Sequence, residues 1–508
     1  MESPPAPPHP PASSRPIWAG LVLALAALVY AGWIYQAGAP YAAGSDSSGY
    51  LNSARLLLRG QLTEAVRTVP GLQPPEWNYF YHQPLGYVVR PGQPVMVPSY
   101  PIGLPLHYAL AAVVVGLEKT ARVVNALNVL AAGLLLYALG RRLGLDRGWA
   151  LTGVALLWAC PIWVFHALQP LSDCVATTWL LAALYGALQA RDRWPWAAFA
   201  GAAFAVAVLV RPTNLLFALP LAVALGGDRR ALGAFILAGL PAAGGLGWYN
   251  FHLYGSGLQS GYGADIWAAF GREFVAGNLR YFAAWIPRVL TWPVVALALL
   301  GLPWLFRRQP RITWLLTLWV AVFVAFYTSY FCAGESWGYL RFLLPAFPAI
   351  IFAALLTAQR AAQVLPDAVR RLAPAVVAVA GLAGQLSLAS ELHVTDIRSG
   401  ERNYWVTAHW LAAHVPSNAI LLTMQLSGTV TFYNTQPLVR WDQISPADFA
   451  RLRRAAARQH RPLYAPLFPF EKPLLQARLG GAWTAVGEAG NITIWRLDES
   501  GPDGPGPG

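Results

Sequence analysis

Apolar residues in this chain gather in long runs of about 17 to 22 residues, which short polar stretches separate. An α-helix rises about 1.5 Å per residue, so a run of this length crosses a hydrocarbon core of about 30 Å. The pattern predicts an all-α polytopic membrane domain with about eleven transmembrane helices. The expected helices cover residues 17–35, 123–139, 149–167, 174–190, 194–210, 213–225, 231–251, 284–305, 312–331, 342–357 and 372–390.

The overall composition agrees with this membrane class. Of 508 residues, 56% are hydrophobic and 12% are charged, whereas soluble domains carry roughly 25% charged residues. The net charge of +13 would suggest nucleic acid as a partner of a soluble protein. Here most arginines lie in short loops between apolar runs, where they set membrane orientation, so we expect no nucleic acid partner.

The positions of these arginines predict which side of the membrane each loop faces. If the N-terminus is cytoplasmic and residues 103–117 do not cross, the Arg-rich loops all fall inside, as the positive-inside rule requires. These loops hold Arg141, Arg142, Arg147, Arg191, Arg193, Arg229, Arg230, Arg307, Arg308, Arg311, Arg360, Arg370 and Arg371. Residues 103–117 are therefore expected to form an interfacial or re-entrant helix on the outer side, with a short tilted span as the alternative.

This topology predicts four parts of the chain. Residues 1–16 are a Pro-rich disordered segment, and residues 17–390 form the membrane domain, whose outer loop 36–122 contains interfacial helices. Residues 391–500 form a small outer α/β domain, and residues 501–508 a disordered tail. Within the outer domain we expect strands at 419–425, 429–433 and 491–497 and a helix at 446–458.

Acidic residues beside the spans are candidates for function, because a charge at a membrane boundary is costly to keep. On the outer side they are Asp46, Glu64, Glu76, Asp173, Asp265, Glu273 and Glu335. Asp46 follows the first span by about ten residues and precedes a helical pattern over 50–60. One interpretation is an N-cap, worth about 1 kcal/mol and without catalysis. The other is a reactive carboxylate at the outer surface.

Several short motifs recur in a fixed order along the first two thirds of the chain. After the first span come Asp46, Tyr50, ARL at 54–56, Gly60, YPIGLP at 100–105, RVVNAL at 122–127, LYALGRR at 136–142, SD at 172–173, RPTN at 211–214, WYN at 248–250, YG at 254–255 and RFLLP at 341–345. This order resembles the GT-C superfamily of polytopic membrane glycosyltransferases, which includes protein O-mannosyltransferases and lipid A aminoarabinose transferases.

The resemblance implies a GT-C-like fold and transfer of a sugar from a polyprenyl phosphate donor on the outer membrane face. On that pattern Asp46 is the general base, because an acceptor hydroxyl is a poor nucleophile until a carboxylate takes its proton. Arg341 and Arg211, at outer ends of spans, are expected to bind the donor phosphate, which guanidinium groups contact bidentately. Snorkelling membrane anchors are the alternative for both arginines.

Further side chains are expected to bind the substrates. Tyr50 belongs to the resembling motif, and Asp173 would orient an arginine or a sugar hydroxyl, unless it is an N-cap. Glu335 lies near Trp337 and Tyr339, whose rings suit a sugar, unless it forms a solvated ion pair. Many family members carry two adjacent acids where this chain has Asp46-Ser47, which leaves the acceptor open among lipid, glycan and protein.

Other chemistries receive less support. No phosphate-binding P-loop or dinucleotide fingerprint is present, and the histidines lack the spacing of a zinc pair, so we expect no cofactor and find no support for a divalent metal. The alternative functions are a multi-span transporter, which would show internal repeats, and a catalytically silent glycan-binding membrane protein. The expected enzyme transfers a hexosyl or pentosyl group in the cell envelope, as a multi-pass protein of the inner (plasma) membrane.

Overall fold

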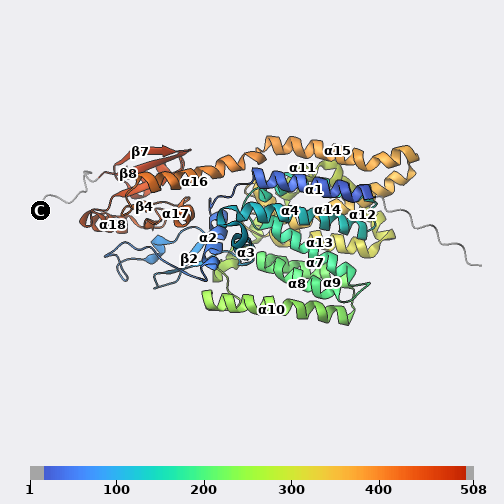
Figure 1. The fold of residues 1–508 in the computed structure, drawn as a ribbon, viewed down its shortest axis with the longest axis horizontal. Helices are drawn as coiled ribbons and strands as arrows, with labels where there is room; N and C mark the ends of the chain where they lie inside the picture. The colour runs from blue at the N-terminus through green and yellow to red at the C-terminus, as the bar shows by residue number, and fades with distance from the viewer. Residues whose placement is uncertain (1–16, 499–508) are drawn as a thin grey trace, which may run out of the picture.

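The computed structural model describes residues 17–498, with the side chains of residues 17–19 and 264–265 left out. The expected disordered ends, 1–16 and 501–508, lie outside these residues. The molecule is elongated, with a bundle of helices at one end and a small sheet at the other (Figure 1). The bundle contains α1 (Ile17–Ala37), α4 (Leu117–Arg142), α5 (Arg147–Trp158), α6 (Pro161–Ala167), α7 (Asp173–Gln189), α8 (Trp196–Val210), η2 (Pro212–Phe217), α9 (Ala218–Leu225), α10 (Arg229–Tyr254), α11 (Val275–Leu290), α12 (Trp292–Arg308), α13 (Pro310–Thr328), η5 (Trp337–Ala346), α14 (Phe347–Ala361) and α15 (Asp367–Glu391).

Six helical segments among the described residues are long and apolar enough to cross a membrane, or up to eight if each of two bent pairs counts as one span. Every stretch predicted as a span is mainly helical, but the expected count of eleven is not confirmed. One cause is length, because α7, α8 and α9 are short. Another is a break at Thr291, whose φ of 73° is not helical, so that the segments before and after it meet at 111°.

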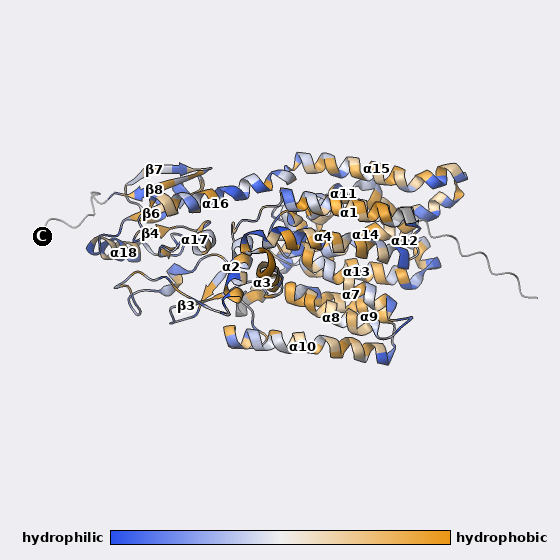
Figure 2. Ribbon diagram, in the orientation of Figure 1, coloured by the Kyte–Doolittle hydropathy of each residue, from blue (hydrophilic) through white to orange (hydrophobic). Residues whose placement is uncertain are grey.

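Hydrophobic residues predominate in the inner helices of the bundle and recur along its peripheral helices (Figure 2). Helix α7 is buried along most of its length against α4 and α8. The peripheral helices α1, α10 and α15 instead expose leucine and valine side chains, such as Leu25, Leu237 and Val379. Exposed apolar surface of this extent suits contact with lipid chains.

Helix α3 (Gly103–Val115) is the ambiguous segment between the outer loop and α4. Its 13 residues give a length of about 20 Å, short of the roughly 30 Å of a hydrocarbon core. Its first residue, Gly103, lies directly on the end of α8, where a Cβ would come within 2.3 Å of the Val210 backbone nitrogen. The length favours an interfacial helix over a span, and its position in the bilayer stays a prediction.

The outer loop forms α2 (Asp46–Leu58) and a small antiparallel sheet in the order β1-β3-β2, from β1 (Glu64–Ala65), β2 (Tyr87–Val89) and β3 (Val95–Pro98), with η1 (Tyr79–His82) before β2. It lies at the same end of the bundle as the C-terminal sheet (Figure 1). His82 ties the two together, because its Nδ1 donates to the Leu438 carbonyl at 2.7 Å while its Nε2 accepts from Trp77.

The C-terminal sheet has the order β5-β4-β6-β8-β7, parallel among the first three strands and antiparallel in the rest. Its elements are α16 (Ile397–His414), β4 (Ile420–Leu422), α17 (Ser427–Tyr433), β5 (Leu438–Val439), α18 (Pro446–Arg458), β6 (Leu463–Leu467), α19 (Glu471–Leu479), β7 (Trp483–Ala489) and β8 (Ile492–Leu497). The helix expected at 446–458 and strands within 419–425 and 491–497 are present. The domain boundary at residue 391 stays a prediction.

The strand expected at 429–433 is wrong, because these residues belong to helix α17. Their β-branched side chains suggested a strand, but tertiary packing overrides that preference. Gly428 lies so close to α2 that a Cβ there would meet Ser48 Oγ at 2.1 Å. The Thr431 hydroxyl donates to the carbonyl four residues earlier, which suits a helix.

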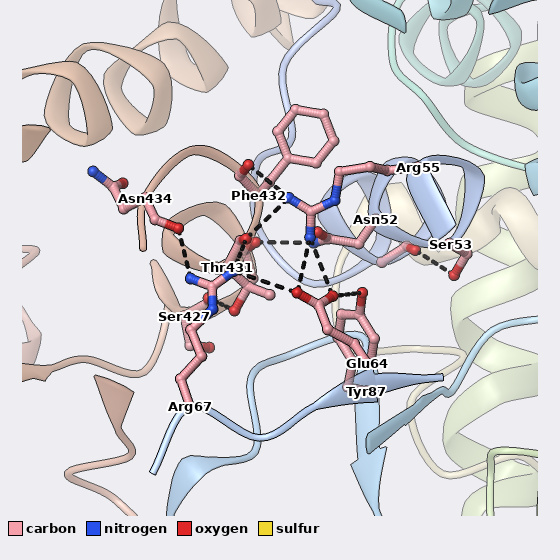
Figure 3. A network of polar contacts seen from close by, with 12 residues as sticks. Asn52, Ser53, Arg55, Glu64, Arg67, Tyr87, Ser427, Thr431, Phe432 and Asn434 are labelled. Atoms are coloured by element: carbon pink, nitrogen blue, oxygen red, sulfur yellow. Dashed lines mark hydrogen bonds and ion pairs between the residues drawn. The ribbon is translucent and has the colours of Figure 1, made fainter. Parts of the chain in front are cut away.

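A polar network joins α2, the outer loop and α17 (Figure 3). Arg55 and Arg67 both pair with Glu64, at 3.2 and 3.4 Å, and both donate to the Thr431 carbonyl. Tyr87 also donates to Glu64, at 2.9 Å. Cations near the C-terminal carbonyls of a helix are favourable. The network therefore holds α2, which begins with Asp46, against the C-terminal part of the chain.

Candidate functional site

Asp46 lies at the end of the bundle where the outer loop meets the helices. It is the first residue of α2, whose N-cap is Ser45, and no side chain makes a capping hydrogen bond there. The carboxylate instead accepts from the Tyr100 hydroxyl at 2.6 Å and from Arg341 Nη1 at 2.7 Å. The N-cap interpretation is therefore wrong, because the carboxylate is turned away from the helix backbone toward these two groups.

This environment keeps Asp46 charged. Burial raises the pKa of its carboxyl, but the Arg341 guanidinium and the Tyr100 hydrogen bond outweigh burial, so that the pKa lies below its usual value of 3.8. Asp46 is consequently deprotonated at neutral pH and available to accept a proton. Its basicity is weak as long as Arg341 stays paired with it.

A second ion pair joins Asp173 to Arg211. Asp173 is the first residue of α7, and Arg211 follows the last residue of α8 with an extended backbone. No side-chain cap occurs at the start of α7, so the N-cap interpretation is wrong here too. The Asp173 side chain is only 2% exposed and that of Arg211 14%, so most of this ion pair is shielded from solvent.

The two pairs are neighbours. Both guanidiniums lie over the ring of Phe342, Arg211 at 5.3 Å and Arg341 at 5.4 Å from its centre. Arg341 also lies 5.8 Å from the ring of Tyr339. Within the described residues, the buried Nε of Arg341 has no hydrogen-bond partner. The structure thus brings together the predicted Asp46, Asp173, Arg211 and Arg341.

Tyrosines connect these elements. The Tyr50 ring is buried, and its hydroxyl donates to Ser172 Oγ at 3.0 Å, which joins α2 to the start of α7. Tyr100 lies against α2 where Gly49 leaves room, since a Cβ at Gly49 would meet the Tyr100 ring at 2.4 Å. The sequence placed Tyr100 in a motif without giving it a role, and only the fold turns its hydroxyl toward Asp46.

The remaining predicted substrate residues are more dispersed. Tyr339 faces Arg341 and Phe342, whereas Trp337 packs edge-on against Phe165 with ring centres 4.8 Å apart. Glu335 is exposed and has no side-chain ion pair within residues 17–498, contrary to the solvated-pair alternative. The side chain of Asp265, another outer acidic residue, lies outside the described residues.

Glu401 is a carboxylate near the site that the sequence did not single out. It belongs to α16, far along the chain from Asp46. Burial, with a smaller contribution from the Asp46 charge, raises the pKa of Glu401 to about 7. No sequence motif marks this residue, because it approaches Asp46 only through folding.

A metal centre has no support in the part of the chain that the structure describes. No group of three or more His, Cys, Asp or Glu side chains there is arranged to hold a metal ion. His82 donates to and accepts from protein groups, and His166 is buried with its Nδ1 on the Ile162 carbonyl. The arrangement at the site is therefore one of paired carboxylates and guanidiniums among aromatic rings.

Comparison with known proteins gives one family match and several similar folds. Residues 100–243 match the family model described as dolichyl-phosphate-mannose-protein mannosyltransferase. The structure of ArnT from Cupriavidus metallidurans bound to undecaprenyl phosphate is similar with a TM-score of 0.59 at 15% identity, covering 97% of this chain and 100% of that one. No curated protein sequence gives a significant match.

Two other solved structures share this architecture. The arabinofuranosyltransferase AftD from Mycobacteria has a TM-score of 0.55 at 16% identity, covering 94% of this chain and 40% of that chain. The Archaeoglobus fulgidus oligosaccharyltransferase, tethered with an acceptor peptide containing the NVT sequon, has a TM-score of 0.54 at 12% identity. The match covers 97% of this chain and 75% of that chain. At these identities the likeness is one of fold.

Proposed function

We propose that this chain, which has the fold of the GT-C glycosyltransferases, is a membrane glycosyltransferase that moves a sugar from a polyprenyl phosphate donor to an acceptor on the outer membrane face. The observation that carries the proposal is the Asp46–Arg341 ion pair, beside the Asp173–Arg211 pair, at the end of the bundle next to the outer loop. The inner (plasma) membrane, a cytoplasmic N-terminus and an outer domain from residue 391 are parts of the same proposal.

The roles follow from charge and geometry. Asp46 is the general base that takes the proton of the acceptor hydroxyl, and the guanidinium of Arg341 binds the donor phosphate. The leaving lipid phosphate needs no general acid when a cation stabilises its charge. Arg211, held by Asp173, adds a second positive charge near Phe342.

Donor binding would also activate the base. In the unliganded arrangement Arg341 lowers the pKa of Asp46, which makes the carboxylate a weak base. A donor phosphate that draws the guanidinium away removes this influence, and burial then raises the pKa of Asp46. The base therefore becomes stronger when the donor is bound. Asp46 then deprotonates the acceptor hydroxyl only when a donor is present to react with it. Tyr339, Trp337 and Glu335 are proposed to contact the sugars.

The test compares wild type with Asp46→Asn in lipid nanodiscs, using a panel of radiolabelled polyprenyl phosphate sugars and membrane extract as the acceptor. Asp192→Asn is the matched control, because Asp192 also pairs with an arginine, Arg142, but lies beyond the opposite end of α7. We expect transfer by wild type and by the control, and a loss of about 10²- to 10⁴-fold in a normally folded Asp46→Asn protein.

Other outcomes would overturn this function. If none of the three proteins released carrier phosphate from any donor, the proposed glycosyltransferase function would be contradicted. Substrate uptake into proteoliposomes would then favour a transporter, and glycan binding without turnover would favour a catalytically silent protein. Full transfer by Asp46→Asn would leave the enzyme class standing and remove Asp46 as its base.

A further inference from the structure

Helix α16 carries a stripe of charged and aromatic side chains that the proposed chemistry does not use. Glu401, Arg402 and Trp405 lie three, four and seven residues after Arg398, which places the four side chains on one face of the helix. That face is turned toward the loop between α1 and α2, since the rings of Trp405 and Tyr41 lie 6.2 Å apart.

An open surface cavity of about 460 Å³ lies between this stripe and the loop. Tyr41, Arg398, Arg402 and Trp405 line it. The volume falls within the range of sites that hold small molecules, roughly 300 to 1,000 Å³. One wall is anchored, because Arg398 Nη1 donates to the Gln36 carbonyl near the end of α1.

The charges in the cavity are incompletely paired. Within residues 17–498, neither Arg398 nor Arg402 forms an ion pair with a carboxylate, and Arg402 is exposed. Two guanidiniums attract an anion, and phosphate in particular, through charge-assisted hydrogen bonds. The rings of Tyr41 and Trp405 offer flat apolar faces of the kind on which a sugar ring lies.

The loop that lines the cavity leads directly to the proposed base. Tyr41 precedes Asp46 by a few residues, and the loop between them is held in place by hydrogen bonds at Ala42 to Tyr433 and Thr429. The same loop lies beside α16, because a Cβ at Gly44 would be 4.0 Å from the hydroxyl of Tyr404 in that helix. Glu401, one turn from both Arg398 and Trp405, stands on the same face.

We propose that this α16 cavity, defined by Tyr41, Arg398, Arg402 and Trp405, is the acceptor subsite and that it takes a phosphate-bearing saccharide. The inference rests on the proposed function, which needs an acceptor next to Asp46. A saccharide fits better than a bare lipid headgroup, because the rings of Tyr41 and Trp405 have a partner in the sugar. The arginines hold the phosphate and leave a hydroxyl free to reach Asp46.

Direct binding tests this subsite without any donor. The full chain, in nanodiscs of uncharged phosphatidylcholine, is titrated with glucose 1-phosphate, methyl glucoside and inorganic phosphate by calorimetry. The variants are Arg402→Gln and Trp405→Leu, and the matched control is Arg454→Gln, an exposed arginine of α18 without an ion pair among the described residues. A thermal melt of each protein checks that it folds.

We expect glucose 1-phosphate to bind wild type and the Arg454→Gln control alike, and about tenfold more weakly to the two cavity variants, while methyl glucoside binds weakly to all. Equal binding of glucose 1-phosphate by all four folded proteins would overturn the subsite. Inorganic phosphate binding as tightly as glucose 1-phosphate, together with displacement by phosphatidylglycerol, would assign the cavity to lipid headgroups instead.

Steady-state kinetics distinguish a failure of the acceptor subsite from a failure of the proposed function. With an acceptor that wild type uses, Arg402→Gln should raise the acceptor KM about tenfold and leave kcat and the donor KM near wild type. Unchanged acceptor KM in an active enzyme would contradict the subsite alone. Cavity binding as expected but no transfer from any donor would contradict the proposed function and the acceptor role while leaving a phosphosaccharide site.

Discussion

Two ion pairs of the same chemistry lie side by side in this protein, and their burial differs. Asp173 is 2% exposed in its pair with Arg211, whereas Asp46 is 27% and Arg341 21% exposed in theirs. A buried pair whose partner is removed leaves an uncompensated charge, while a more accessible pair can open at a lower cost. The comparison assigns the Asp173–Arg211 pair mainly to holding the site and the Asp46–Arg341 pair to exchange with ligands.

The largest expected effect is on stability. Asp173→Asn should lower the free energy of unfolding by about 3 to 5 kcal/mol, because it leaves Arg211 charged and buried without its partner. Asp46→Asn should cost about 1 kcal/mol or less. Chemical denaturation of both variants in the same detergent measures the difference. Equal losses of stability would remove the distinction between the two pairs.

The next effect is on donor binding. Arg341→Gln should reduce kcat/KM for the polyprenyl phosphate donor about 100-fold, which corresponds to about 2.7 kcal/mol, because the phosphate loses its charged partner. Arg341→Lys should recover only part of this loss, since a lysine lacks the planar fork of donors. Steady-state kinetics with varied donor make the comparison. An unchanged donor KM in Arg341→Gln would place the phosphate elsewhere.

A smaller effect is expected at Tyr100. Its hydroxyl donates to Asp46 at 2.6 Å, so Tyr100→Phe removes one hydrogen bond to the carboxylate and leaves the ring in place. We expect a fall of about tenfold in kcat, or about 1.4 kcal/mol, with little change in the donor KM. Tyr87→Phe is the matched control, because it removes a tyrosine hydroxyl that donates to Glu64 in the outer-loop network. This variant should keep wild-type kcat.

The smallest expected effect is on pH dependence. Arg341 lowers the pKa of Asp46, so wild type should keep its base deprotonated well below neutral pH. In Arg341→Gln burial prevails, the pKa of Asp46 rises, and the acidic limb of the activity profile should move to higher pH by about one unit. Arg341, Tyr100 and Asp173 influence the pKa of Asp46. The Asp46 charge in turn acts on Tyr50, Tyr262, Tyr339 and Glu401. An acidic limb at unchanged pH would contradict Asp46 as the titrating base.

Glu401 complicates the neutral region of the same profile, because its pKa is about 7. The Glu401→Gln variant removes that transition and leaves the acidic limb of Asp46 alone, so the profile of the double variant with Arg341→Gln isolates the shift. Asp46 and Tyr404 are the titratable groups that interact with Glu401 among the described residues. If the shift of the acidic limb seen in Arg341→Gln disappears when Glu401→Gln is added, the shifted transition belongs to Glu401 and not to Asp46.

The resemblance to the GT-C superfamily that the motifs indicated is confirmed at the level of fold. Several details were missed for physical reasons. The count of eleven spans is not confirmed, because helices such as α7 and α8, with 17 and 15 residues, are shorter than the roughly 20 residues of a full crossing. The strand predicted at 429–433 failed because packing on α2, rather than local preference, decides that segment.

The sequence by itself determined what depends on local pattern: the membrane class from apolar runs, the helix at 446–458 from its periodicity, and the candidates Asp46, Asp173, Arg211 and Arg341 from their places at span ends. Only the tertiary structure decided which carboxylate pairs with which arginine, because Asp46 and Arg341 are 295 residues apart. The tertiary structure also brought Tyr100 to Asp46, and it brought α16 to the loop between α1 and α2. Contacts between distant segments depend on how helices pack, and no local pattern of residues records that packing.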